Sequence, residues 1–170
     1  AKAYGGLSFT SPAQSMLVSK VDSRSVAAGI TVMVPNSLGP GELLEKYGTH
    51  EQKEKYLGRL AKGLEVPCFA LTGVHSGSDA GGMRDIGIVG KGLHNGKEVL
   101  AVTLSWDKRY ITLAPVATLV GLAFILHDPD NLLGRGEKIG ITLALGPHKH
   151  PGVEIGRRHF PARQAFMNGP

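Results

Sequence analysis

The residues of this chain best suited to hold a polar ligand lie from Phe69 to Gly81, where an apolar strand runs into a turn rich in hydroxyls and glycines. An apolar, strand-like run from Val66 to Leu71 precedes it and can hold the backbone rigid. Thr72, Ser76 and Ser78 offer hydroxyl groups, and the glycines let a ligand approach the main chain closely. Loops carried by rigid strands are common sites of function. A glycine-serine surface turn after an edge strand explains the same composition, so both interpretations stay open here.

Other catalytic arrangements have weaker support. His148 and His150 lie in a turn bounded by prolines, but no cysteine or paired carboxylate joins them at the spacing of a zinc site. Ser76 and Ser78 are near a histidine and an aspartate, yet neither serine meets the G-x-S-x-G pattern of a hydrolase. The run from Gly87 to Gly92 lacks both the GK[ST] ending of a phosphate loop and the G-x-G-x-x-G order. We therefore predict no metal site.

Helices are expected in the first third of the chain. Ser11-Pro12 is a typical helix start, and that helix can continue to Ala28-Gly29, where glycine can end it. Gly39-Pro40 opens a second, shorter helix that ends before Gly48. Thr49 is expected to cap a third helix over Glu51 to Ala61.

After residue 63 the pattern changes to short runs rich in Val, Ile, Thr and Leu, separated by glycine or proline. Strands are expected over Val66–Thr72, Asp85–Val89, Lys97–Ser105, Tyr110–Leu113, Val116–His127, Ile139–Leu145 and Val153–Gly156. Asn95-Gly96 between apolar runs predicts a hairpin. Short strands at this spacing indicate an antiparallel barrel or sandwich.

Five motifs follow one another at a spacing that belongs to a known family. They are Tyr47-Gly-Thr-His-Glu-Gln-Lys-Glu-Lys-Tyr-Leu-Gly-Arg-Leu-Ala-Lys-Gly63, Phe69-Ala-Leu-Thr72, Ser76-Gly-Ser-Asp-Ala-Gly81, Asn95-Gly-Lys97 and Lys108-Arg-Tyr-Ile-Thr112, and Gly152-Val-Glu-Ile-Gly156 continues the series. This set resembles the acyl-CoA dehydrogenase family, with the pattern YGTxEQKxxYLxxLxxG, FALTEPxxGSD and NGxKxWIT. Tyr4-Gly-Gly6, Asn36-Ser-Leu-Gly39 and Lys108-Arg-Tyr110 are most similar to its long bacterial fatty-acid-degrading branch.

The resemblance implies an α+β chain that is part of a longer polypeptide. Residues 1–63 would be part of an N-terminal all-helical domain, and residues 64–170 a middle antiparallel β-barrel domain that binds flavin and acyl-CoA, truncated at its C-terminal end. The C-terminal four-helix domain of the family is expected to be missing.

The activity that the resemblance implies is FAD-dependent α,β-dehydrogenation of a fatty acyl-CoA, the first oxidative step of fatty-acid β-oxidation. The proton leaves the α-carbon and the hydride leaves the β-carbon for the flavin, which supplies the difficult chemistry. The partners would be the acyl-CoA substrate and an electron-transfer acceptor, and the full-length protein would be a homo-oligomer. The family's general base is a glutamate of the missing domain, so we name no catalytic residue in this chain and expect it to be inactive alone.

Seven residues match the family's cofactor-binding positions: Phe69, Leu71, Thr72, Ser78, Tyr110, Ile111 and Thr112. Main-chain groups of Phe69 and Leu71 would lie near the flavin ring, and Thr72 would bond its pyrimidine edge. Ser78 would lie near the flavin phosphate and the pantetheine arm of the substrate, where the amides of the glycine turn suit an anion. Thr112 would bond the N5 edge.

The chain departs from the family pattern at three places. Tyr110 replaces the usual tryptophan that covers the flavin, and tyrosine can still stack with less area. Gly73-Val74 replaces glutamate and proline, which removes a carboxylate from the turn. His75 stands where a small residue is usual and is interpreted as a surface histidine.

The composition sets limits on compartment and partners. The formal net charge is +5 and the pI about 9.4, but the basic residues are scattered and only 6% of residues are aromatic, which disfavours nucleic acid. Cys68, the single cysteine, excludes a disulfide framework and is expected to be a buried hydrophobe. The expected location is the cytoplasm, and membrane association of the full-length protein stays open. The alternatives are a non-catalytic acyl-CoA- or flavin-binding relative and, more remotely, a basic β-barrel that binds nucleic acid.

Overall fold

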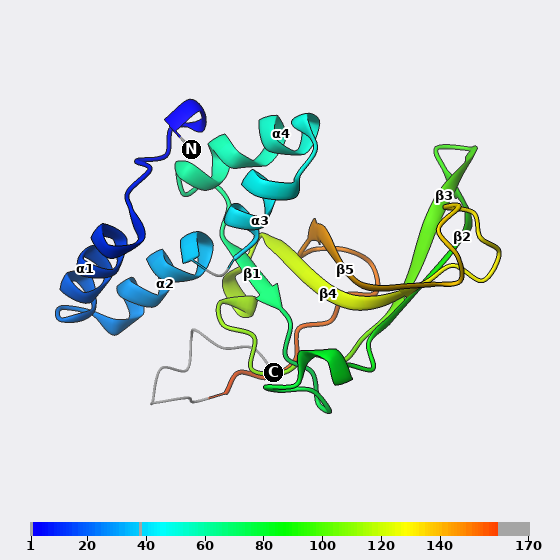
Figure 1. Ribbon diagram of the computed structural model, residues 1–170. Coiled ribbons are helices and arrows are strands. Elements are labelled where there is room, and N and C mark those ends of the chain that lie inside the picture. Colours follow the sequence, from blue (N-terminus) through cyan, green and yellow to red (C-terminus); the bar gives the residue numbers. More distant parts are fainter. Residues whose placement is uncertain (1, 38, 160–170) are drawn as a thin grey trace. The chain divides into compact units, whose positions relative to one another are not determined.

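The computed structural model describes residues 2–37 and 39–159 of the chain. The helices come first and the strands follow (Figure 1). The elements are η1 (Lys2–Tyr4), α1 (Ser11–Asp22), α2 (Val26–Ser37), α3 (Pro40–Tyr47), α4 (His50–Ala61), β1 (Pro67–Ala70), η2 (Ala80–Gly82), β2 (Ile86–His94), β3 (Lys97–Ser105), η3 (Ala114–Val116), β4 (Leu119–His127) and β5 (Lys138–Pro147). The α+β class expected from the sequence is confirmed.

The first predicted helix is two helices. α1 ends at Asp22, and the Ser25 hydroxyl accepts a hydrogen bond from the backbone N–H of Ala28 at 3.3 Å, which satisfies a free amide at the start of α2. The prediction of one helix from Ser11 to Ala28 is therefore wrong, because a local serine cap competes with the continuing helix.

α4 begins as the sequence predicts. The Thr49 hydroxyl accepts from the Gln52 N–H at 3.2 Å, and the Gln52 side chain accepts from the Thr49 N–H at 2.9 Å. This reciprocal capping box satisfies two amides that a helix start leaves free. Leu57 is the buried residue of the helix.

The strands form a five-stranded sheet in the order β1-β4-β2-β3, with β5 paired to β4. β2 and β3 form the predicted antiparallel hairpin from Ile86 opposite Ser105 to His94 opposite Lys97. Asn95 and Gly96 make its turn with φ of 52° and 74°, the left-handed values that this dipeptide tolerates. The sheet is mixed rather than wholly antiparallel as expected, because β2 pairs with β4 in parallel over Ile86–Ile88 and Ile125–His127.

Two segments expected as strands are not strands in the structure. Tyr110–Leu113 forms no strand because Tyr110 and Leu113 have φ of 58° and 68°, outside the extended region. Val153–Gly156 also has no ladder partner among the described residues.

The chain divides into two compact units, each built from separated stretches of sequence. The first contains residues up to Phe69, Tyr110–Gly121 and residues from Leu145 onward; the second contains Ala70–Arg109 and Leu122–Ala144. The sequence-based domain boundary near Gly63 stays a prediction.

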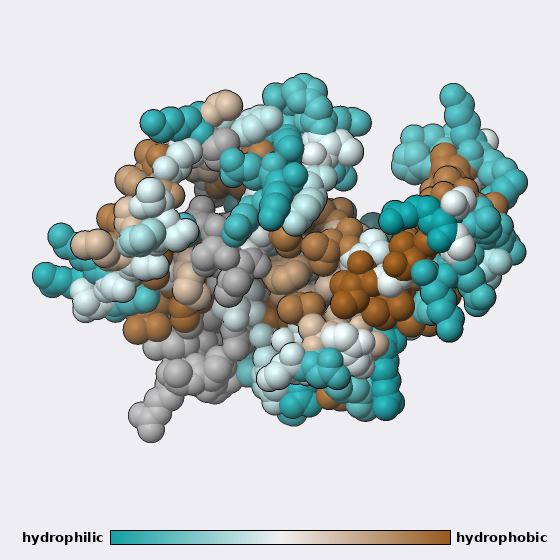
Figure 2. Space-filling model, viewed as in Figure 1, coloured by the Kyte–Doolittle hydropathy of each residue, from teal (hydrophilic) through white to brown (hydrophobic). Residues whose placement is uncertain are grey.

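Each unit has a buried apolar core. Leu44, Leu57, Cys68, Ile111, Leu113 and Leu119 are buried in the first unit, and Met83, Val89, Leu122, Phe124 and Leu126 in the second. The β2–β3 hairpin of the second unit also carries apolar side chains at its surface (Figure 2), among them Leu93, Leu100 and Val102.

Candidate flavin-binding site

The turn that follows β1 is closed by its own backbone. The Gly73 N–H donates to the Ser76 carbonyl at 2.9 Å, and the Ser76 N–H donates to the Gly73 carbonyl at 3.4 Å. Ser76 is buried, whereas Ser78 is exposed. The turn therefore presents Ser78 to solvent and keeps the Ser76 hydroxyl inside.

A buried ion pair lies beneath this turn in the second unit. The Lys108 Nζ lies 2.6 Å from Asp85 Oδ2 and also donates to the Leu71 carbonyl at 2.9 Å. The other carboxylate oxygen, Asp85 Oδ1, accepts from the Asp107 N–H at 2.9 Å. Charged groups of this kind are rarely buried unless they are paired and hydrogen-bonded, and this pair is both. No local signal in the sequence links Asp85 to a lysine 23 residues away, so its role is visible only in the structure.

The same turn is held to the 107–109 segment by its backbone. The Arg109 N–H donates to the Thr72 carbonyl at 3.1 Å, and Gly73 forms an antiparallel bridge with Lys108. Together with the Lys108 side chain, these contacts fix consecutive residues from Leu71 to Gly73. Thr72, one of the predicted flavin contacts, thus lies on a backbone with little freedom to move.

A cavity of about 210 Å³ adjoins the turn in the second unit. Its lining combines an aromatic ring with polar and charged side chains: Gly73, Val74, His75, Ser76, Arg84, Asp85, Ser105, Trp106 and Asp107. His75 is exposed, in agreement with the surface interpretation made from the sequence.

The carboxylate of Asp79, a residue of the same loop, is hydrogen-bonded to the glycine-rich end of the loop. Asp79 precedes η2 and accepts from the Gly82 N–H at 3.2 Å. A Cβ atom at Gly82 would lie 2.9 Å from Asp79 Oδ2, so this side chain packs directly against the turn. The Gly82 amide belongs to the glycine turn that was expected to bind an anion, and it already donates a hydrogen bond within the chain.

The Tyr110–Thr112 segment belongs to the first unit and has a strained backbone. Tyr110 and Leu113 both adopt left-handed φ, which costs about 1–2 kcal/mol per residue for side chains other than glycine. The Tyr110 ring is exposed and lies 4.8 Å from the His159 ring, at an interplanar angle of 58°. Ile111 is buried and Thr112 is half-buried. Strain of this kind gathers at functional sites, where surrounding structure maintains it.

The hydroxyls of Thr72 and Thr112 are available to a ligand. Both side chains are half-buried, and within the described part of the chain neither hydroxyl has a hydrogen-bond partner. Phe69 and Thr112 belong to the first unit and Leu71, Thr72 and Ser78 to the second. The expectation that all of these residues meet one flavin stays a prediction.

Cys68 is not a reactive thiol in the folded chain. It lies in β1 and is buried, and burial raises the pKa of its thiol to about 12. A thiol with this pKa is protonated at neutral pH and is a poor nucleophile.

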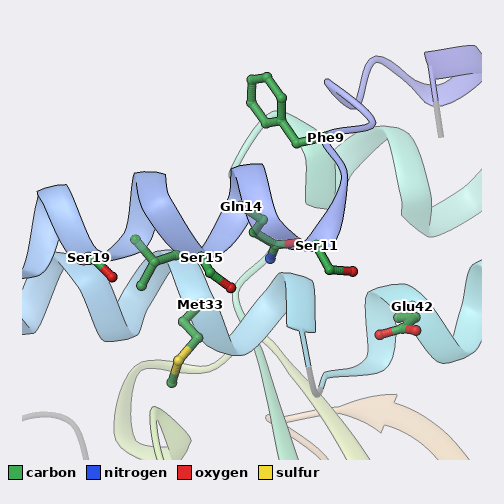
Figure 3. Close-up of a pocket in the computed structure, with 8 residues that line it drawn as sticks. Phe9, Ser11, Gln14, Ser15, Ser19, Met33 and Glu42 are labelled. Carbon is green, nitrogen blue, oxygen red and sulfur yellow. The ribbon is translucent and has the colours of Figure 1, made fainter.

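A second cavity, of about 680 Å³, lies in the first unit and contains none of the predicted site residues. Ser11, Ser15 and Ser19 of α1 line it together with Met33 of α2 (Figure 3). Within residues 2–37 and 39–159, no three His, Cys, Asp or Glu side chains come together as metal ligands would. None of the described helices combines the length and the apolarity that crossing a membrane requires.

Comparison with known proteins agrees with this fold. Residues 1–64 match the family described as "Acyl-CoA dehydrogenase, N-terminal domain". The chain is 35% identical over 155 residues to an acyl-CoA dehydrogenase of Bacillus subtilis (strain 168), an alignment that covers 91% of this chain and 37% of that protein. The chain belongs to the acyl-CoA dehydrogenase family.

Other proteins similar to this acyl-CoA dehydrogenase family member include a reductase and a solved acyl-CoA dehydrogenase. A 3-(aryl)acrylate reductase of Clostridium sporogenes (strain ATCC 15579) is 34% identical over 157 residues, covering 92% of this chain and 37% of that protein. The solved structure of an acyl-CoA dehydrogenase from Bacillus anthracis complexed with FAD has a TM-score of 0.78 at 22% identity, over 99% of this chain and 26% of that chain, and shows the same fold. The chain spans 37% of the length of both sequence relatives.

Proposed function

We propose that this chain is the flavin- and acyl-CoA-binding part of an FAD-dependent acyl-CoA dehydrogenase that converts a fatty acyl-CoA to its trans-2-enoyl-CoA in fatty-acid β-oxidation. Family membership supports the class of reaction. The observation that carries the flavin assignment is the pair of half-buried, partner-free hydroxyls of Thr72 and Thr112, each in a motif of the family pattern. Two solved structures of the same fold are FAD complexes.

The residues present fit a flavin. Thr72 and Thr112 would each supply a hydroxyl, and main-chain groups of Phe69 and Leu71 would lie near the ring, although the Leu71 carbonyl already accepts from Lys108 Nζ. The Tyr110 ring, exposed and next to buried Ile111, offers an apolar face for stacking. When bound, the flavin takes up the hydride that leaves the β-carbon of the substrate.

The role of this chain in that reaction is to bind and orient. Thr72 sits on a turn held by the hydrogen bond from the Arg109 N–H and by the one from Lys108 Nζ to the Leu71 carbonyl, so its hydroxyl is preorganised rather than ordered on binding. Exposed Ser78 would hold the pantetheine arm and the flavin phosphate. The base that removes the α-proton would come from a glutamate elsewhere in the whole protein, and we expect these 170 residues alone to be inactive.

The proposal also includes an electron acceptor and an oligomeric state for the whole enzyme. The reduced flavin would pass its electrons to an electron-transfer protein, and an electron transferring flavoprotein of Acidaminococcus fermentans is among the solved structures with a related fold. The whole enzyme would be a homo-oligomer in the cytoplasm.

A second candidate is the reverse reaction, reduction of an α,β-unsaturated acyl group. The specific observation in its favour is that two sequence relatives are named 3-(aryl)acrylate reductase and acryloyl-CoA reductase (NADH). The two directions use the same flavin contacts, so the residues described above fit both. Anaerobic assays of the full-length protein with a saturated acyl-CoA and an artificial acceptor, and with an enoyl-CoA and reduced flavin, would separate them.

The test of the flavin site uses the full-length enzyme with Thr72→Val and Thr112→Val. Each change removes one hydroxyl and keeps the side-chain shape, so we expect weaker flavin retention or slower flavin reduction. Thr103→Val is the matched control, because Thr103 is exposed on β3 and outside the proposed site. Unchanged flavin absorbance per protein and unchanged turnover in both site variants would count against the assignment.

A further inference from the structure

We propose that Asp85 and Lys108 are positioning residues for the Leu71–Gly73 turn, and that Asp85 takes over the place of the carboxylate that the family pattern carries at position 73. The inference rests on the proposed function in one respect only, namely that this turn faces a flavin. Its structural part depends on the second unit alone.

Both members of the pair are hydrogen-bonded. Lys108 Nζ has two acceptors, Asp85 Oδ2 and the Leu71 carbonyl, and both oxygens of Asp85 are used. Only 1% of the Lys108 side chain and 5% of the Asp85 side chain are exposed. A buried pair of this kind contributes little net stability compared with well-packed apolar residues, so its value lies in fixing a particular geometry. The geometry fixed here is that of the turn that carries Thr72.

Gly73 explains why the carboxylate is at position 85. Its φ lies outside the left-handed region, so the backbone does not require glycine. A Cβ atom at Gly73 would lie 3.0 Å from Ser76 Oγ and 3.2 Å from Asp85 Oδ2. The Asp85 carboxylate therefore fills the space into which a side chain at position 73 would project.

One carboxylate is enough to pair with Lys108, and it can come from position 73 or from position 85. The family pattern supplies a glutamate at position 73, where this chain has glycine, and here Asp85 reaches the same space from the start of β2. A second carboxylate at position 73 would meet Asp85 at close range, and like charges at that distance repel. Glycine at 73 and aspartate at 85 thus form a matched combination.

The experiment exchanges the two positions in the full-length protein. We compare wild type, Asp85→Ser, Gly73→Glu, and the double variant Gly73→Glu with Asp85→Ser. The single Asp85→Ser leaves the buried lysine without a carboxylate partner, and we expect flavin affinity to fall at least about tenfold. The double variant restores one carboxylate beside Lys108, and we expect it to recover most of that loss, whereas Gly73→Glu alone does not.

A second measurement, the rate of flavin reduction, distinguishes a positioning role of Asp85 from a purely structural one. In variant molecules that still hold flavin, we expect the rate of flavin reduction at saturating substrate to follow the same order as the affinity. Asp85→Asn provides the shape-conserving variant if Asp85→Ser fails to fold. Full flavin affinity in Asp85→Asn, or a folded double variant that recovers nothing, would overturn the inference.

The same proteins also show whether the proposed function, and not the role of Asp85, is wrong. If wild-type full-length protein binds no flavin, the proposed function is wrong, and the structural part is then read from hydrogen exchange of the Arg109 amide, which donates to Thr72. Protection that is lost in Asp85→Ser and restored in the double variant supports the relocated carboxylate. Protection that is the same in all four proteins overturns it.

Discussion

Asp85 and Lys108 meet through atoms 2.6 Å apart at a place where neither side chain reaches solvent. The two residues come from different parts of the chain, the start of β2 and the segment after β3, and their contact also engages Leu71 and Asp107. A second ion pair, Lys91 with Glu98 at 2.9 Å, joins β2 to β3, but both of its side chains are mostly exposed. The two pairs differ mainly in burial, which makes them a natural comparison.

Lys108→Met is expected to lower the free energy of unfolding of this chain by about 3–5 kcal/mol, because it leaves the Asp85 carboxylate buried without its partner. Lys91→Met is the control and is expected to change the free energy of unfolding by less than about 1 kcal/mol, since water screens an exposed pair. Urea unfolding monitored by circular dichroism measures both. Equal effects of the two substitutions would contradict the role of burial.

Thr118→Val is expected to raise the pKa of Glu65. The hydrogen bond from the Thr118 hydroxyl, followed by the Arg59 side chain with Nε 2.8 Å from Glu65 Oε1, holds the pKa of this carboxyl below its usual value. A carboxyl with a lowered pKa adds stability above the pKa it has in the unfolded chain, and this stability is lost as the pH falls through the folded value.

The carboxyl resonance of Glu65, titrated by NMR, checks this prediction. In Thr118→Val we expect its midpoint to move toward the usual value and the acid-dependent part of the unfolding free energy to become smaller. Thr103→Val, on the exposed strand β3, is expected to leave the titration unchanged. A Glu65 midpoint that does not move in Thr118→Val would show that the hydroxyl is not the cause.

Gly87→Ala and Gly90→Ala, two identical substitutions in β2, are expected to have opposite effects. A Cβ atom at Gly87 would lie 2.5 Å from the Phe124 ring and 2.9 Å from Val102 Cγ1, so alanine there is expected to cost about 1–3 kcal/mol. A Cβ atom at Gly90 meets nothing within 4 Å, and alanine there is expected to add about 0.4–1 kcal/mol by restricting the unfolded chain. Thermal unfolding of both variants gives the sign, and the same sign for both would contradict the packing described here.

Tyr110→Gly is expected to separate stability from flavin binding. Glycine adopts the left-handed φ of this position without penalty, which offsets the loss of the ring contact with His159, so the unfolding midpoint is expected to change little. Met16→Gly is the control, because Met16 is an exposed residue in the interior of α1, where glycine costs about 1 kcal/mol. In the full-length enzyme, Tyr110→Gly is expected to retain less flavin, and full retention would exclude a stacking role.

The parts of the fold that the sequence predicts well are those with local signals. α4 carries its capping box within four residues, and the β2–β3 hairpin follows from Asn95-Gly96 between two apolar runs. The break between α1 and α2 was missed because the Ser25 cap competes with a pattern that also suits a continuous helix.

The sequence predicts the candidate site only in part, because the residues of the site come from distant positions in the chain and not from one local signal. Thr72 and Thr112 were found through the family pattern, and their lack of partners within the described residues is consistent with that choice. The left-handed backbone at Tyr110 and Leu113 was not foreseen, because β-rich composition favours an extended segment. Asp85 was not foreseen because its significance comes entirely from Lys108 and Gly73.

The strand β1 cannot be held in place when it first leaves the ribosome. The Val66 N–H, just ahead of β1, donates to the Thr118 hydroxyl, which the ribosome adds 52 residues later. The nascent chain therefore completes α1 to α4 while the residues that hold β1 are still unsynthesised, and closing so long a loop is slow. Until that moment β1 also lacks its partner strand β4, and a chaperone that masks its apolar residues is expected to raise the yield of folded protein.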